Sequence, residues 1–192
     1  VPTTANWTSN GVATTYTEGD VLQFDDTAAT GTVDVQATVN PGGITIANDT
    51  LAYLIDSSFF VGISGTNGLT KKGPGTATLG KQLLNFYSGP TVIEAGKLVN
   101  QTGGWNLSSD YTLMTGATNT IEVTAAFSQY AVQSLTCEAG SVLEFDYGSV
   151  APDTFTAPLR TDNSSGSGDV TINGPTEIRI LGGSSWPPGV YP

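Results

Sequence analysis

The chain has 192 residues, of which 38% are hydrophobic, 12% are charged and 24 are glycine, and its formal net charge is −11 at pH 7. This composition excludes extended disorder and predicts one ordered, turn-rich domain of the all-β class. The negative charge disfavours nucleic acid and anionic membranes as partners, because both carry charge of the same sign.

Short strands that follow glycine or another turn residue recur along the chain. The predicted starts lie, in order, at residues 19–25, 43–46, 68–70, 96–98, 118–123, 140–146 and 168–172. The segments 19–25 and 140–146 also repeat each other, since both contain Gly, then Val-Leu, then Phe-Asp at the same spacing. Successive starts are about 22 to 28 residues apart, which is typical of repeat architectures.

Between these starts, apolar and polar residues alternate, as in segments 32–39 and 177–180. Such alternation places one face of a strand towards a core. No segment sustains the 3.6-residue apolar period of a helix, so we expect little or no helix. The expected fold is a parallel β-solenoid, with an antiparallel β-sandwich as the alternative, because short strands between turns suit both folds.

The segment 69–98 contains a pattern of glycines, β-branched residues and polar residues at fixed spacings. Its residues are Leu69, Thr70, Lys71, Gly73, Gly75, Thr76 and Leu79, followed by Asn85, Tyr87, Ser88, Gly89, Thr91, Ile93, Ala95, Gly96 and Leu98. This pattern resembles the autotransporter-associated β-strand repeat of bacterial passenger domains. Two departures from that repeat are Ala77, where leucine is usual, and a longer bridge at residues 80–84. The resemblance implies a right-handed parallel β-helix exported to the cell surface, and it implies no activity.

We expect a single solenoid domain over residues 1–192, with residues 1–10 and 184–192 as terminal caps or tails. The last segment contains several prolines, which lack the backbone donor that a sheet needs. Segments 100–110 and 162–168 are polar and rich in Gly and Ser, and we predict that they are loops. No apolar run approaches the ~20 residues that would span a bilayer.

The residues available for chemistry are few. The sequence contains no histidine and a single cysteine, Cys137, so Ser-His-Asp and Cys-His arrangements and a zinc site are excluded. No phosphate-binding loop or dinucleotide fingerprint is present. Residues 166–169 faintly resemble one copy of a calcium-binding repeat, but a turn is the preferred interpretation. We expect no cofactor and no metal.

Carboxylates are the remaining candidates for catalysis. The two pairs are Asp25 with Asp26 and Glu144 with Asp146, and paired carboxylates can divide the acid and base roles of glycoside cleavage. The preferred interpretation is that all four are solvated residues at outward positions of strands. The sequence therefore predicts that the protein is not an enzyme.

Five Asn-X-Ser/Thr sequences are potential acceptors of N-linked glycans. The predicted loops make Asn100, Asn106 and Asn163 the most accessible of them. Trp105 lies in the same predicted loop and is a candidate platform for stacking against a sugar ring.

These features predict an extracellular or cell-surface protein with a structural or adhesive function. Open ends of a solenoid expose unpaired backbone and an apolar cross-section. We therefore expect end-to-end association with further copies, or membership of a longer solenoid. The alternatives are a carbohydrate-active enzyme or a glycan-binding module on a parallel β-helix. Surface glycans are candidate partners, whereas nucleic acid and membrane insertion are not expected.

Overall fold

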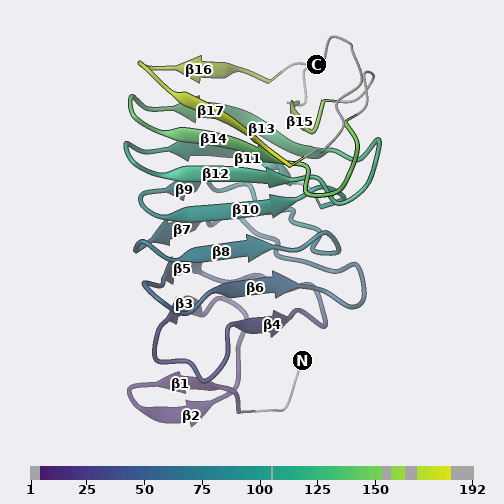
Figure 1. Ribbon diagram of the computed structural model, residues 1–192. Coiled ribbons are helices and arrows are strands. Elements are labelled where there is room, and N and C mark those ends of the chain that lie inside the picture. The colour runs from purple at the N-terminus through teal and green to yellow at the C-terminus, as the bar shows by residue number, and fades with distance from the viewer. Residues whose placement is uncertain (1–4, 105, 153–156, 163–167, 183–192) are drawn as a thin grey trace.

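The computed structural model describes residues 5–104, 106–152, 157–162 and 168–182. Over these residues the chain contains strands and no helix, and it winds into a parallel β-solenoid (Figure 1). The winding is right-handed. In Figure 1 the chain rises from bottom to top, while the strands of one sheet run to the right in front and those of the other run to the left behind.

Each turn of the solenoid, here called a coil, contributes strands to two parallel sheets. One sheet contains, from the N-terminal end, β4 (Thr32–Asp34), β6 (Tyr53–Asp56), β8 (Thr76–Leu79), β10 (Lys97–Gln101), β12 (Thr118–Glu122), β14 (Val142–Asp146) and β17 (Glu177–Leu181). The other contains β3 (Val21–Asp25), β5 (Gly43–Ala47), β7 (Leu69–Lys72), β9 (Thr91–Ile93), β11 (Asn106–Leu113), β13 (Tyr130–Cys137), β15 (Leu159–Thr161) and β16 (Val170–Ile172).

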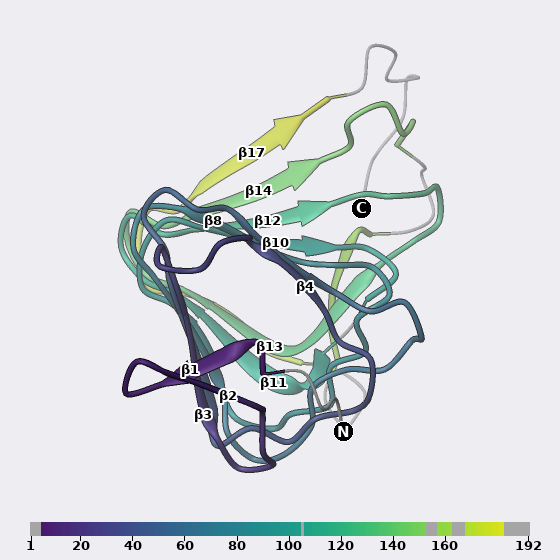
Figure 2. The same cartoon turned by 90° about the horizontal axis from the view of Figure 1, so that it is seen from below.

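The predicted parallel β-helix is therefore confirmed, and the sandwich is excluded. Among the described strands one pair is antiparallel, namely β1 (Trp7–Ser9) with β2 (Val12–Thr14), which form a hairpin at the N-terminal end. Seen from that end, the two sheets meet at one corner, and an irregular third side closes the cross-section (Figure 2). With no helix in the described part of the chain, none is present there that could cross a membrane.

Glycine forms the corner where the two sheets meet. Gly73, Gly96, Gly116 and Gly140 each lie between the two strands of one coil, where the chain passes from one sheet to the other, and each has φ between 66° and 78°. Only glycine adopts this left-handed backbone without steric cost. At Gly96 the backbones of successive coils also touch, because a Cβ there would lie 2.4 Å from the carbonyl oxygen of Gly73. Two of these corner glycines, Gly96 and Gly140, are also glycines that begin predicted strand starts.

The core consists of columns in which one inward side chain from each coil stacks on the next. One column runs through Ile46, Lys71, Ile93, Leu113 and Cys137, all in register and all with 0% exposure. The burial of Cys137 agrees with its interpretation as a small buried hydrophobe. Because successive coils pair in register, the same strand positions face inward in every coil. Alternation of inward and outward residues along each strand therefore fills the interior.

The segment 100–110 is the main error of the sequence-based prediction. It was expected to be a loop, but β10 extends through Gln101 and β11 begins at Asn106. Asn100 and Asn106 are fully buried, and the Nδ2 of Asn100 donates to Oδ1 of Asn119 in the next coil at 2.6 Å. Polar side chains that bond to one another across coils can occupy inward positions that a pattern reading assigns to apolar residues.

Candidate functional site

No described strand continues the solenoid beyond its last coil at the C-terminal end. The last coil, which holds β15, β16 and β17, places four apolar side chains in register above inward positions of the coil below, namely the buried Leu135, Cys137 and Leu143 and the half-buried Phe145. These side chains are 54–64% exposed, and they belong to Val170, Ile172, Ile178 and Ile180. No described strand pairs with the outer edges of β16 and β17. This end therefore combines an apolar surface with free backbone donors and acceptors.

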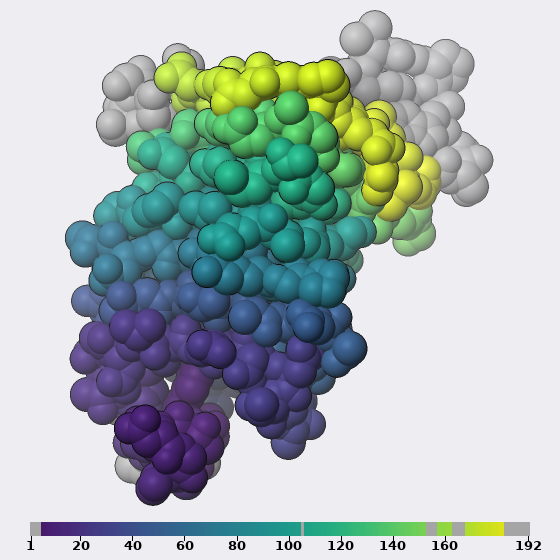
Figure 3. All heavy atoms as spheres, turned by 90° about the vertical axis from the view of Figure 1, so that its left-hand side faces the viewer, coloured from purple at the N-terminus to yellow at the C-terminus, as the bar shows by residue number. Residues whose placement is uncertain are grey.

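The N-terminal end is covered differently. The β1–β2 hairpin lies beneath the first coil, which holds β3 and β4 (Figure 3). Trp7 of the hairpin packs edge-on against Phe24 of β3, with ring centroids 5.3 Å apart. A largely apolar cavity of about 110 Å³ remains between hairpin and coil, lined among others by Trp7, Leu22, Phe24, Val33 and Val35.

Asp25 and Asp26 do not form a catalytic pair. Both oxygens of Asp26 accept hydrogen bonds from the backbone of the next coil, including the amides of Asp49 at 2.7 Å and Leu51 at 2.6 Å. These bonds lower the pKa of Asp26 well below its usual range. Asp25 accepts hydrogen bonds from Thr27, which lower its pKa as well. A carboxylate held in its charged form by structural donors is a poor general acid.

The bonding of Asp26 is one case of a recurring device, in which a carboxylate of one coil accepts a hydrogen bond from a donor in the next. Glu18 accepts from the amide of Asn40, Asp34 from the amide of Ser58, and Asp56 from the amide of Gln82. The sequence predicts that the four candidate carboxylates are solvated residues. For Asp26 this interpretation is incomplete, because its carboxylate also accepts structural hydrogen bonds from the next coil. Such acids join the turns of successive coils, although the sequence marks them only as exposed polar positions.

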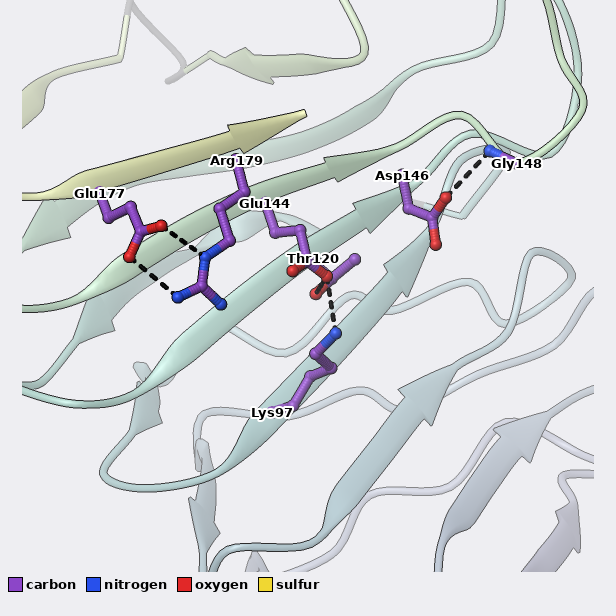
Figure 4. A network of polar contacts seen from close by, with 7 residues as sticks. All are labelled: Lys97, Thr120, Glu144, Asp146, Gly148, Glu177 and Arg179. Atoms are coloured by element: carbon purple, nitrogen blue, oxygen red, sulfur yellow. Dashed lines mark hydrogen bonds and ion pairs between the residues drawn. The ribbon is translucent and has the colours of Figure 1, made fainter. Parts of the chain in front are cut away.

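Glu144 lies at the centre of a polar network on the outer face of the seven-stranded sheet (Figure 4). It is 3% exposed, so the prediction that it is solvated is wrong. One oxygen accepts from Nζ of Lys97 at 2.6 Å and from the hydroxyl of Thr120 at 2.9 Å. Burial alone raises the pKa of Glu144, but these two hydrogen bonds outweigh it and the net pKa is lowered. Because β12 lies between β10 and β14, the ion pair spans two coil interfaces.

A polar groove of about 370 Å³ lies where the strands of the same sheet end. Its wall contains Gln101, Glu122 and Asp146, which stand in register, one per coil. Glu122 accepts from the side-chain amide of Gln101 at 3.2 Å, and Asp146 accepts from the amide of Gly148 at 2.9 Å. Asp146 thus lies apart from the network of Glu144, and the two do not form a pair. Lys81, Thr124 and Ser149 also line the groove.

Two of the four residues that were predicted to carry or bind glycans lie in the described part of the chain. Asn100 and Asn106 are buried in strands, so the expectation that they are accessible is wrong for the folded chain. Asn163 and Trp105 lie outside the described residues.

The interior contains a polar cluster that the sequence analysis missed. The hydroxyls of Tyr111 and Tyr130 are 2.8 Å apart, and Tyr111 also donates to Oδ1 of Asn100 at 3.3 Å. Both tyrosines are buried, and burial raises their pKa well above the usual range. The signal that could have revealed this cluster is the position of each residue in the inward-outward alternation of its strand. Asn100 and Asn119 both stand at positions whose side chains face the interior.

Lys71 is a fully buried cation at the glycine corner. Its ammonium donates to the carbonyls of Lys72 at 2.6 Å and Gly73 at 2.8 Å. Burial lowers its pKa to about 8. The lysine thus satisfies turn carbonyls inside the solenoid, which is a structural use of a residue that a sequence pattern places on the surface.

The chain has no match among family models, curated proteins or solved structures. Among the described residues no group of three or more His, Cys, Asp or Glu side chains could hold a metal ion.

Proposed function

We propose that the protein is a structural element of a surface or extracellular assembly. In this proposal it is a rigid β-solenoid that is extended coil upon coil at its C-terminal end, by a second copy or by further coils of a longer chain. The observation that carries the proposal is the exposed set of inward-facing side chains on the last coil: Val170, Ile172, Ile178 and Ile180.

Two further features support the proposal. The two ends differ, so a contact between them is heterologous and repeats into a filament unless it closes. Large apolar surfaces with free strand edges are uncommon on proteins that remain single, because such edges recruit other strands. An adhesive function is compatible with this architecture, in which loops on the third side would meet the partner.

We expect no catalysis. Of the acids proposed from the sequence, Asp25 and Asp26 accept structural hydrogen bonds, and Glu144 is neutralised by Lys97. Assays against neutral and acidic polysaccharides should show no cleavage. Turnover that vanishes in Asp146→Asn or Glu122→Gln, with the fold intact, would contradict this part of the proposal.

The proposal is tested by the association of the full chain. Sedimentation velocity and electron microscopy at rising concentration should show linear, end-to-end particles. Ile178→Asp places an unpaired carboxylate in the contact and should abolish them. Phe59→Asp is the matched control, because Phe59 is also 64% exposed but lies in the loop after β6. A chain that stays single at high concentration, or one that Phe59→Asp disrupts equally, would refute end-to-end extension.

A second candidate function, glycan binding, is favoured by the polar groove. Gln101, Glu122 and Asp146 repeat at the coil spacing of ~4.8 Å, which is close to the rise of one sugar in an extended glycan. Two carboxylates against one lysine favour a cationic amino sugar. A linear glucosamine hexamer should bind, and Glu122→Gln should weaken it more than Glu94→Gln, which makes the same change at an exposed site elsewhere. Equal effects of the two variants would indicate nonspecific attraction to the acidic surface.

A further inference from the structure

The hairpin at the N-terminal end covers side chains without closing the sheets. β1 and β2 pair only with each other, and no described strand pairs with the outer edges of β3 and β4. The backbone of the first coil therefore remains open for parallel pairing, as it is at the other end of the molecule.

The attachment of the hairpin is weak compared with the contact between two coils. Its packing centres on Trp7 against Phe24, while Val12 on the opposite strand is 69% exposed. The cavity of about 110 Å³ shows that the hairpin does not fill the surface it covers. Isolated two-stranded hairpins are marginally stable in water, so this element gains little from its own pairing.

The surface of the first coil that the hairpin covers matches the surface on which the last coil of another copy would need to stack. Within the molecule, the strands of each coil stack in register on the strands of the next, from β3 on β5 to β14 on β17. Leu22 and Phe24 begin two columns of one sheet, and Val170 and Ile172 end these columns at the opposite end of the molecule. The first coil of one copy can thus continue the columns of the last coil of another.

We propose that the β1–β2 hairpin is a displaceable cover on the N-terminal end, and that a second copy of the chain displaces it by stacking its last coil onto β3 and β4. This inference rests on the proposed end-to-end function and adds a control to it. The closed hairpin weakens association, because only the open fraction accepts a partner.

The size of the control follows from the open fraction. The apparent dissociation constant equals the intrinsic constant divided by the fraction that can bind, so a hairpin closed in about nine-tenths of molecules weakens association about tenfold. Trp7→Ala removes the ring that holds the hairpin against Phe24. This variant should therefore associate with a dissociation constant about tenfold lower than the original chain.

The experiment compares full-length variants by sedimentation velocity over a concentration series, with circular dichroism to verify the fold. Val12→Ala, on the exposed side of the same hairpin, is the matched control and should associate like the original chain. The double variant Trp7→Ala with Ile178→Asp should remain monomeric. Its first coil is uncovered, but the last coil of the other copy then carries a carboxylate in the apolar contact. Electron microscopy of Trp7→Ala should show linear particles.

The outcomes separate this inference from the function on which it rests. If the original chain associates end to end but folded Trp7→Ala associates no more tightly, the hairpin is not a cover, although the proposed function stands. If Trp7→Ala still assembles in the Ile178→Asp background, its association uses another surface and the inference fails. If no variant associates at any concentration, both proposals fail.

Discussion

Alanine substitutions at two corner glycines separate two effects on stability, namely the strain of left-handed backbone and the close approach of successive coils. Gly96 and Gly116 occupy the same corner in successive coils, with φ of 66° and 78°. A Cβ at Gly96 would lie 2.4 Å and 2.6 Å from the carbonyl oxygens of Gly73 and Gly75, whereas a Cβ at Gly116 would meet nothing within 4 Å. Alanine at either position bears the left-handed strain, but alanine at Gly96 also forces two backbones apart.

The expected magnitudes follow from these contacts. Left-handed backbone costs an L-residue about 1–2 kcal/mol, so Gly116→Ala should lose about that much stability. Overpacking adds about 1–3 kcal/mol, so Gly96→Ala should lose about 2–5 kcal/mol. The clash is with backbone, and the amide of Lys97 bonds the oxygen of Gly75 at 3.2 Å, so relaxation breaks a coil-to-coil bond.

Thermal and urea unfolding, followed by circular dichroism, measure the difference. At about 3 °C per kcal/mol for a domain of this size, the midpoint should fall by about 3–6 °C in Gly116→Ala and by about 6–15 °C in Gly96→Ala. The two substitutions change the entropy of the unfolded chain in the same way, so that effect cancels in the comparison. Equal losses in the two variants would show that the close approach of successive coils at Gly96 does not contribute, and would refute the reasoning.

Three further predictions concern polar groups. Because the folded pKa of Asp26 is lowered, its stabilisation is complete above the unfolded pKa near 4 and is lost as pH falls, so the melting temperature of Asp26→Asn should depend less on pH between 5 and 2. Lys97→Met leaves the buried carboxylate of Glu144 without its cation and should cost about 1–3 kcal/mol in urea unfolding, whereas adding Glu144→Gln should recover part of that loss. Tyr111→Phe removes the hydrogen bonds of the Tyr111 hydroxyl to the buried Tyr130 and Asn100 and should cost about 1–3 kcal/mol; a neutral effect would contradict the hydrogen-bonded core.

Much of the fold could be predicted because the solenoid repeats local signals. Glycine before a strand and alternation within it are properties of neighbouring residues, and they predicted short strands that recur at the coil spacing. These signals suit a sandwich as well, and the resemblance of residues 69–98 to a known repeat favoured the parallel coils that the structure contains. Local alternation can show that Asn100 faces inward, but it cannot show what satisfies the buried amide, because the partner Asn119 lies in another coil. The donors to Asp26 are likewise 23 to 25 residues away in the chain, and only the register identifies them.

The direction of the backbone bonds determines how the molecule would bear load. Both sheets are hydrogen-bonded along the long axis, so tension between the two ends acts on the coil interfaces one after another, and the weakest of them yields first. β7 and β8 pair with the coils on either side over only three or four residues per strand, whereas β17 pairs with β14 over five and both β15 and β16 pair with β13. The interfaces of the coil that holds β7 and β8 should therefore yield before the last coil separates. The Lys97–Glu144 pair crosses two interfaces and would transmit force past the strand between them, which makes the stretch from β10 to β14 the part most resistant to pulling.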